Sequence, residues 1–146
     1  MGFLKAIKDI DGRWVMSLHR GESIRDEIEG LASREGILGA KLSAIGAIED
    51  PDIGGYDLEK REYHRKSFHG LWELLSFQGN ISMLEGNAFM HAHITISGPD
   101  YKVFGGHLFD ARVGVVTEVF LEPLTVPLPR IYCEAIGLAR LEPLEL

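Results

Sequence analysis

Residues 88–107 read AFMHAHITISGPDYKVFGGH, and this stretch decides the fold. Side chains alternate in character over 88–97, which is typical of a β-strand with one buried face. The residues at 97–100, SGPD, are those that turns favour. We expect a second strand at 101–104, ended by the two glycines that follow it. The stretch therefore predicts an antiparallel hairpin.

Three of the six histidines lie on this hairpin, at His91, His93 and His107. Because residues i and i+2 of a strand point to the same side, His91 and His93 emerge on one face. The register decides where His107 lies. A loop centred on Asp100 places His107 opposite His93, and one centred on Pro99 places it opposite His91. A loop with an even number of residues turns His107 to the other face, unless the preceding glycines form a bulge.

Three converging imidazoles would form a site that binds Zn²⁺ well and other borderline divalent ions, such as Cu²⁺ or Ni²⁺, acceptably. A catalytic type of site keeps its fourth position open, whereas a closed site needs a further ligand from Glu73, Glu118 or a neighbouring subunit. Glu73 stands in an apolar run, where it either acts as a buried carboxylate or alternates outward. Spacing alone equally allows ordinary strand histidines. We assign no catalytic residue.

One segment, 23–35, has the pattern of an amphipathic helix. Ser23 is a good N-cap, and Asp26 and Glu27 place negative charge in the first turn. Gly36 follows as a C-terminal stop. The apolar residues recur at helical spacing and form a single stripe: Ile24, Ile28, Leu31 and Ala32.

Most of the remaining chain consists of short strand-like runs divided by glycine, of which there are 17. We expect strands at 13–18, 40–48, 63–68, 70–78, 113–121 and 132–138, with a turn and strand start at 54–57. Prolines at 123–129 indicate an extended connection. The prediction is a single α+β domain over 1–146, with its core at about 13–138. Its sheet is mainly antiparallel and barrel-like, with one main helix packed on it.

The chain has 22 acidic and 15 basic residues among 146, a net charge of −7. An acidic chain lacks the broad basic surface that binding to a phosphate backbone requires. A short basic segment at 60–66, KREYHRK, is the one local candidate, and an ordinary solvated loop explains it equally well.

The single cysteine, Cys133, excludes an internal disulfide and CxxC motifs, and we expect a buried, inert thiol. The N-terminal sequence lacks the apolar core of a signal peptide. No run approaches the roughly 20 apolar residues of a membrane span. We expect a soluble, cytoplasmic protein without membrane partners.

Several motifs in order along the chain resemble the plants-and-prokaryotes-conserved (PPC) domain. They are 42–48 (LSAIGAI), 70–81 (GLWELLSFQGNI), 91–100 (HAHITISGPD) and 105–108 (GGHL). The resemblance runs from about 13 to 138. It implies an antiparallel sheet with a packed helix, assembled as a homotrimer, and a divalent metal held by His91, His93 and His107.

The resemblance implies no established reaction. In plants the domain is fused to AT-hook segments that bind the DNA minor groove, and this chain has no Arg-Gly-Arg-Pro core. We therefore expect a homotrimer that binds zinc, with the metal open to a small-molecule ligand. The alternatives are a DNA-associated regulatory protein and a trimeric interaction scaffold whose metal is structural.

Overall fold

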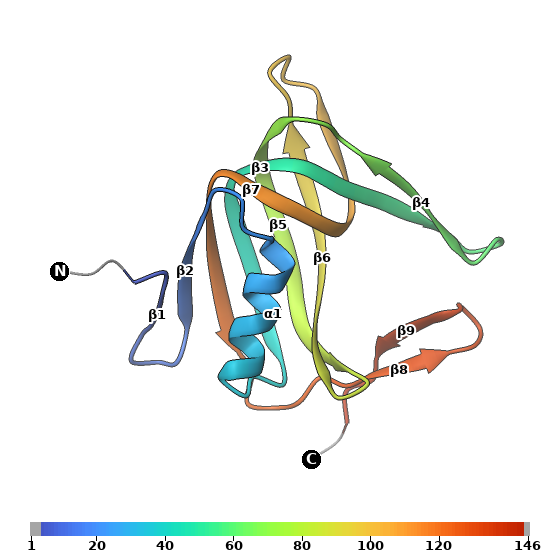
Figure 1. The fold of residues 1–146 in the computed structure, drawn as a ribbon. Coiled ribbons are helices and arrows are strands. Elements are labelled where there is room, and N and C mark those ends of the chain that lie inside the picture. Colours follow the sequence, from blue (N-terminus) through green and yellow to red (C-terminus); the bar gives the residue numbers. More distant parts are fainter. Residues whose placement is uncertain (1–3, 145–146) are drawn as a thin grey trace.

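Strand pairing dominates the fold of residues 4–144, the part of the chain that the computed structural model describes (Figure 1). The ends of the predicted domain, 1–3 and 145–146, lie outside the described residues. The helix is α1 (Ile24–Arg34). The strands are β1 (Ala6–Lys8), β2 (Trp14–His19), β3 (Ala40–Asp57), β4 (Glu62–Ser67), β5 (Leu71–Leu84), β6 (Asn87–Ser97), β7 (Val103–Pro123), β8 (Arg130–Cys133) and β9 (Leu138–Leu141).

The main sheet has seven strands in the order β1-β2-β7-β6-β5-β3-β4. Long strand β7 pairs with β6 near its start, with β2 along its second half, and with β3 from His107 to Pro123. Strand β3 pairs with both β5 and β7, and β6 pairs with the same two strands. The pairings of β3, β5, β6 and β7 therefore form a closed ring. The paired strands are antiparallel and only one helix accompanies them in the described residues, so the predicted mainly antiparallel sheet with one packed helix is confirmed.

Helix α1 forms where its sequence predicted. The Ser23 hydroxyl accepts a hydrogen bond from the backbone N–H of Asp26 at 3.2 Å, as expected of an N-cap. All four residues of the predicted apolar stripe are buried. They pack against β6 and β7, so the helix covers the inner face of the strands that carry the histidines.

Two glycine pairs that predicted interruptions lie inside long strands instead. Strand β3 continues through Gly54 and Gly55, and β7 continues through Gly105 and Gly106. A Cβ on Gly106 would lie 2.7 Å from the carbonyl oxygen of Gly54, closer than real Cβ atoms approach. Glycine is therefore needed here because two strands meet closely, not because a strand ends.

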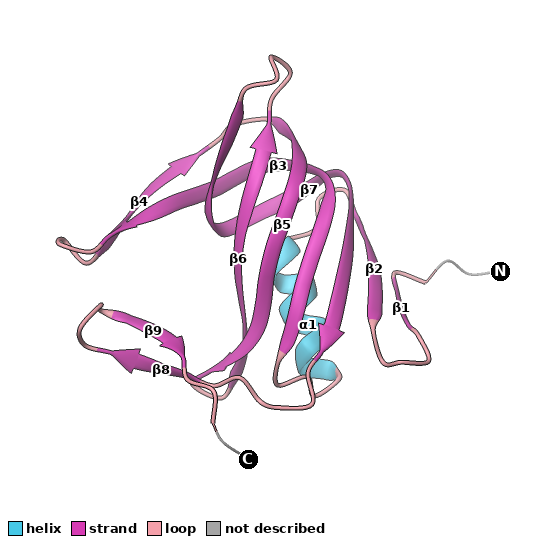
Figure 2. Ribbon diagram, turned by 180° about the vertical axis from the view of Figure 1, so that it is seen from behind, coloured by secondary structure: helices cyan, strands magenta, loops and turns pink. Residues whose placement is uncertain are grey.

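The C-terminal region also differs from the predicted strand at 132–138. A turn at 134–137 divides it into the two-stranded hairpin β8–β9. Figure 2 shows this hairpin on the same side of the molecule as the β3–β4 hairpin. The Tyr56 hydroxyl donates a hydrogen bond to the carbonyl oxygen of Ile136 at 2.6 Å, which connects the two hairpins. In the described part of the chain, no helix has the length and apolar character that crossing a bilayer requires.

Candidate metal centre

The three histidines of the 88–107 stretch lie together on one face of β6 and β7. His93 pairs directly with His107, so the loop is centred on Asp100, one of the three registers considered from the sequence. The ring centroids are 5.2 Å apart for His91 and His93, 5.1 Å for His91 and His107, and 5.5 Å for His93 and His107. One ring nitrogen from each lies within 4.8 Å of those of the other two.

Burial keeps two of these imidazoles neutral. His91 and His107 are half-buried, and desolvation, followed by nearby positive charge, lowers the pKa of each to about 4. Neutral imidazole has a free lone pair, which is the form that ligates metal. His93 is exposed at the rim of the cluster.

His107 has an unsatisfied nitrogen. Its Nδ1 is buried and finds no hydrogen-bond partner among the described residues. Tyr63 stacks on the ring at 4.9 Å between centroids, and Phe109 meets it edge-on at 4.8 Å. A buried polar atom without a partner costs about 1–3 kcal/mol, so this nitrogen would gain from a ligand.

Arg130 makes direct contact with the cluster. Its Nη2 donates a hydrogen bond to His91 Nδ1 at 3.2 Å. Because a guanidinium can only donate, His91 Nδ1 must accept, and in the metal-free protein the neutral ring carries its proton on Nε2. Nothing in the sequence indicated this contact, because Arg130 lies 39 positions from His91 and follows the proline-rich connection.

A cavity of about 680 Å³ opens beside the cluster, with His91 and His107 in its wall. Arg25 and Glu29 from α1 also line it. Arg25 Nη1 donates to Glu29 Oε1 at 2.8 Å, and the same oxygen accepts the backbone N–H of Met90 at 2.9 Å. In the sequence these two residues form an i, i+4 pair that is indistinguishable from an exposed helix ion pair, so they were not predicted as site residues.

The two carboxylates considered as further ligands lie elsewhere. Glu73 is exposed and pairs with Ser97 at the far end of β6, and Glu118 is exposed on the second half of β7. Within residues 4–144, the only group of three or more potential ligands is the histidine triad itself. Cys133 is half-buried rather than buried, and it is not a member of the group.

Comparison with known proteins identifies the family. The sequence model of the Plants and Prokaryotes Conserved (PCC) domain matches residues 7–125. The chain belongs to this family. The resemblance of the 42–48, 70–81, 91–100 and 105–108 motifs to the PPC domain, as the same family is also abbreviated, is thereby confirmed.

Several solved structures share this fold over nearly their whole length. A metal-containing protein from Archaeoglobus fulgidus is 36% identical, with a TM-score of 0.85 over 97% of this chain and 99% of that one. A plant- and prokaryote-conserved protein from Pyrococcus horikoshii is 33% identical, with a TM-score of 0.85 over 100% and 99%. A protein from Ralstonia eutropha that has been suggested to bind DNA is 27% identical, with a TM-score of 0.88 over 94% and 95%. No protein of curated function matches this chain.

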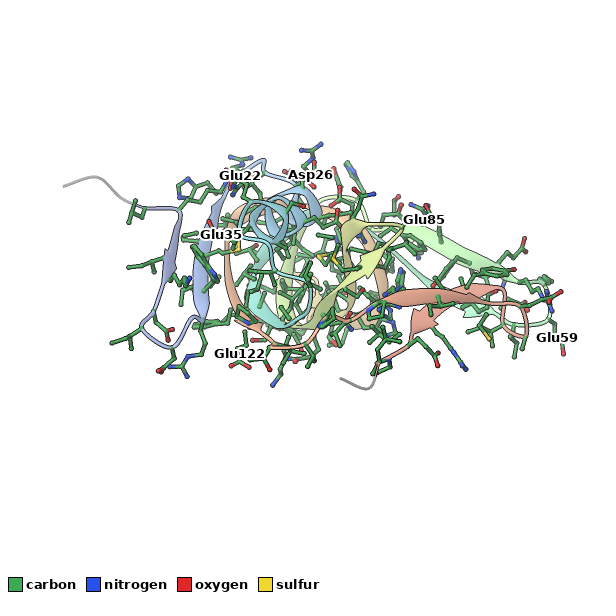
Figure 3. The ribbon with its side chains drawn as sticks, turned by 90° about the horizontal axis from the view of Figure 1, so that it is seen from below. Glu22, Asp26, Glu35, Glu59, Glu85 and Glu122 are labelled. Carbon is green, nitrogen blue, oxygen red and sulfur yellow. The ribbon has the colours of Figure 1, made fainter. Side chains whose placement is uncertain are left out.

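Two basic side chains of the 60–66 segment in this PPC domain lie beside acids. Arg65 forms an ion pair with Asp52, and His64 Nε2 lies 3.2 Å from Asp57 Oδ2. Figure 3 shows the acid at Glu59 on the tip of the same hairpin, with further acidic side chains around the rest of the molecule. These acids reduce the positive charge that the 60–66 segment could offer to a DNA backbone.

Proposed function

We propose that this PPC-domain protein binds a divalent metal ion, zinc in the first place, through His91, His93 and His107. One observation carries the proposal: three imidazoles converge, with ligand atoms within 4.8 Å of one another. The unsatisfied Nδ1 of His107 supports it, because an ion would give a buried atom its missing partner. The metal-containing relative from Archaeoglobus fulgidus supports it as well.

Zinc suits this ligand set. Zinc–nitrogen bonds of about 2.0–2.1 Å in a tetrahedral site bring the ligand atoms roughly 3.3 Å apart, so the rings would close slightly around the ion. Three neutral nitrogen donors leave the fourth position for water or another ligand. When bound there, zinc would supply a Lewis acid and a water of lowered pKa. The chain's own contribution is to hold His91 and His107 neutral and to place both of them in the wall of the cavity.

In this proposal the ion binds a ligand and is not needed to stabilise the fold. None of the three histidines belongs to the hydrophobic core, and His93 is exposed. A structural ion would instead be enclosed by four protein ligands. Chelation distinguishes the two roles: we expect the metal-free protein to remain folded, whereas a scaffold with a structural metal would unfold.

A homotrimer is the second part of the proposal. On two strands of the sheet, an apolar residue in the core is followed by an exposed apolar residue on the outer face. Ala44 is followed by Ile45, and Leu74 by Leu75. Two adjoining surface hollows both include Ile45 and Leu75. One of them also includes Phe120, and the other includes Val115. A contiguous apolar patch of this kind indicates an interaction surface, and a second and third copy of the chain would bury it.

Elemental analysis tests the metal proposal. Tag-free protein, purified without added metal and then dialysed against zinc, should contain close to one zinc per chain by mass spectrometry of the elements. The variant with His91→Ala and His93→Ala should lose that zinc, because two of the three ligands are gone.

The matched control replaces two exposed histidines outside the cluster, His19→Ala and His69→Ala, and should keep the full zinc content. Zinc that is equally retained by both variants would place the ion elsewhere. No zinc in the wild-type protein would mean that the histidines are ordinary strand residues.

A further inference from the structure

The cavity beside the histidines contains an arginine without a counter-ion. The Arg130 guanidinium is half-buried, and burial lowers its pKa. It donates to Ser82 Oγ at 2.6 Å, to the carbonyl oxygen of Ala139 at 3.2 Å and to Asn80 Oδ1 at 3.2 Å, besides His91. All of these partners are neutral, and among residues 4–144 no carboxylate forms an ion pair with Arg130. Burying a charge without an opposite charge is costly unless a ligand supplies one.

The other charges around the cavity are balanced within the protein. Arg25 pairs with Glu29 at 2.8 Å, and Arg65 pairs with Asp52. Arg25 also donates to the carbonyl oxygens of Phe109 and Met90, at 2.8 and 2.9 Å, so its guanidinium is fixed in the wall. Apart from the metal, Arg130 is therefore the one charge in the cavity lining that no neighbouring residue of the described chain balances, and it can pair with one carboxylate of a ligand.

The donors of Arg130 connect anion binding to metal binding. A guanidinium has five N–H groups, and four of these are used: one on Nε, one on Nη1 and two on Nη2. One of the Nη2 bonds ends on His91 Nδ1. A metal on Nδ1 would take that lone pair, and a metal on Nε2 would move the ring proton to Nδ1. In either case Arg130 loses this acceptor, so it has two N–H groups free for a carboxylate.

The remaining walls are apolar and aromatic. Phe89, Phe109 and Tyr63 line the cavity with Leu84 and Leu138. The Arg130 guanidinium lies over the Phe89 ring, 5.4 Å from its centroid. A volume of about 680 Å³ is of the size that drug-sized organic molecules occupy, so the walls suit an organic body rather than a small inorganic ion.

We propose that this cavity binds a small organic monocarboxylate with an aromatic or other apolar body, whose carboxylate lies between Arg130 and the metal. The inference deepens the proposed function and rests on it for the metal. The aromatic walls hold the body of the ligand. Hairpin β8–β9 carries Arg130 and also contributes Leu138 and Ala139 to the wall, so it is part of the binding site.

Calorimetric titration of protein with confirmed zinc content tests this. The probes are benzoate, its uncharged analogue benzamide, and inorganic phosphate. We expect benzoate to bind at least about ten-fold more tightly than either of the others, because only benzoate offers both one negative charge and a planar apolar body. We also expect benzoate to bind metal-free protein at least about ten-fold more weakly, because Arg130 then stays engaged with His91.

Two variants on hairpin β8–β9 distinguish a specific effect of Arg130 on benzoate binding from a general effect of positive charge. Arg130→Gln should retain zinc and bind benzoate at least about ten-fold more weakly than the wild type. Arg140→Gln removes an exposed arginine that pairs with Glu142, and it should bind benzoate as the wild type does. Circular dichroism checks that both variants are folded, and the comparison of benzoate with benzamide uses the wild-type protein alone.

The failures are distinguishable. Absence of zinc would overturn the proposed function before any anion is added. Zinc-loaded protein that binds benzamide or phosphate as tightly as benzoate would overturn the carboxylate inference and leave the metal site in place. Equal benzoate affinity in folded Arg130→Gln would also overturn it.

Discussion

At the scale of single residues, the candidate site depends on a few close approaches between strands. His91 and His93 lie on one face because strand residues two apart point the same way, and this was predictable from the sequence. The place of His107 was not, because it depends on a register that three loop lengths allowed. Arg130 left no local signal, since its relation to His91 is produced entirely by the tertiary fold.

Gly79 is a residue on which this arrangement depends. It lies opposite Ala92 on β6, and a Cβ on it would lie 2.3 Å from the carbonyl oxygen of His91. Gly79→Ala should therefore push β6 away from β5 at the metal ligands. We expect a loss of about 1–3 kcal/mol in the free energy of unfolding, as for overpacked cores, together with weaker zinc binding. Urea unfolding and a competitive zinc titration measure both.

Gly55→Ala is the matched control for this substitution. A Cβ on Gly55, in the neighbouring strand β3, would meet nothing within 4 Å. We expect little change in stability or zinc affinity. If Gly79→Ala behaved like Gly55→Ala, the close contact between β5 and β6 would not be what positions His91.

At the scale of elements, the helix and the hairpin were predictable because each is specified locally. The helix has a cap, an acidic first turn and a 3.6-residue apolar period, and the hairpin has alternation around a turn sequence. The lengths of β3 and β7 were not predictable, because glycine marks both strand ends and close strand contacts. Only the long-range pairing of Gly54 with His107, beside Gly106, shows that these glycines mark a close contact between strands and not a strand end.

The N-cap of α1 gives a prediction at this scale. Ser23 accepts from Asp26 N–H at 3.2 Å and donates to Asp110 Oδ1 at 3.2 Å, while itself buried. Ser23→Ala should lower the free energy of unfolding by about 1 kcal/mol, because both partners lose a hydrogen bond. Thermal or urea denaturation measures this. Ser33→Ala, at an exposed position of the same helix, should be neutral or slightly stabilising, and an equal loss in both would contradict the capping account.

At the scale of the whole molecule, the two faces of the sheet have different uses. The inner face packs on α1 and forms the core, whereas the outer face exposes Ile45, Leu75, Val115 and Phe120. The alternation that predicted the strands could not predict this patch, because an apolar residue on an outward face looks the same in sequence as one in a core. Assembly through the outer face would leave the cavity beside the histidines to a ligand.

The assembly proposal predicts the effect of charge on this face. Ile45→Glu places a carboxylate at a position that is 55% exposed in the single chain and would be buried in the trimer. We expect the trimer to dissociate to monomers, measured by size-exclusion chromatography with light scattering, because an unpaired buried charge is costly. Leu58→Glu, at a 57% exposed apolar residue in the β3–β4 turn, should leave the trimer intact. A wild-type monomer would contradict the assembly.

The most direct test of the central claim is a crystal structure of the zinc-loaded protein with anomalous data collected at the zinc absorption edge. We predict one anomalous peak per chain, between the imidazoles of His91, His93 and His107 and open to the cavity that Arg130 lines. A zinc peak elsewhere, or none at the three histidines in crystals that contain zinc, would contradict the account.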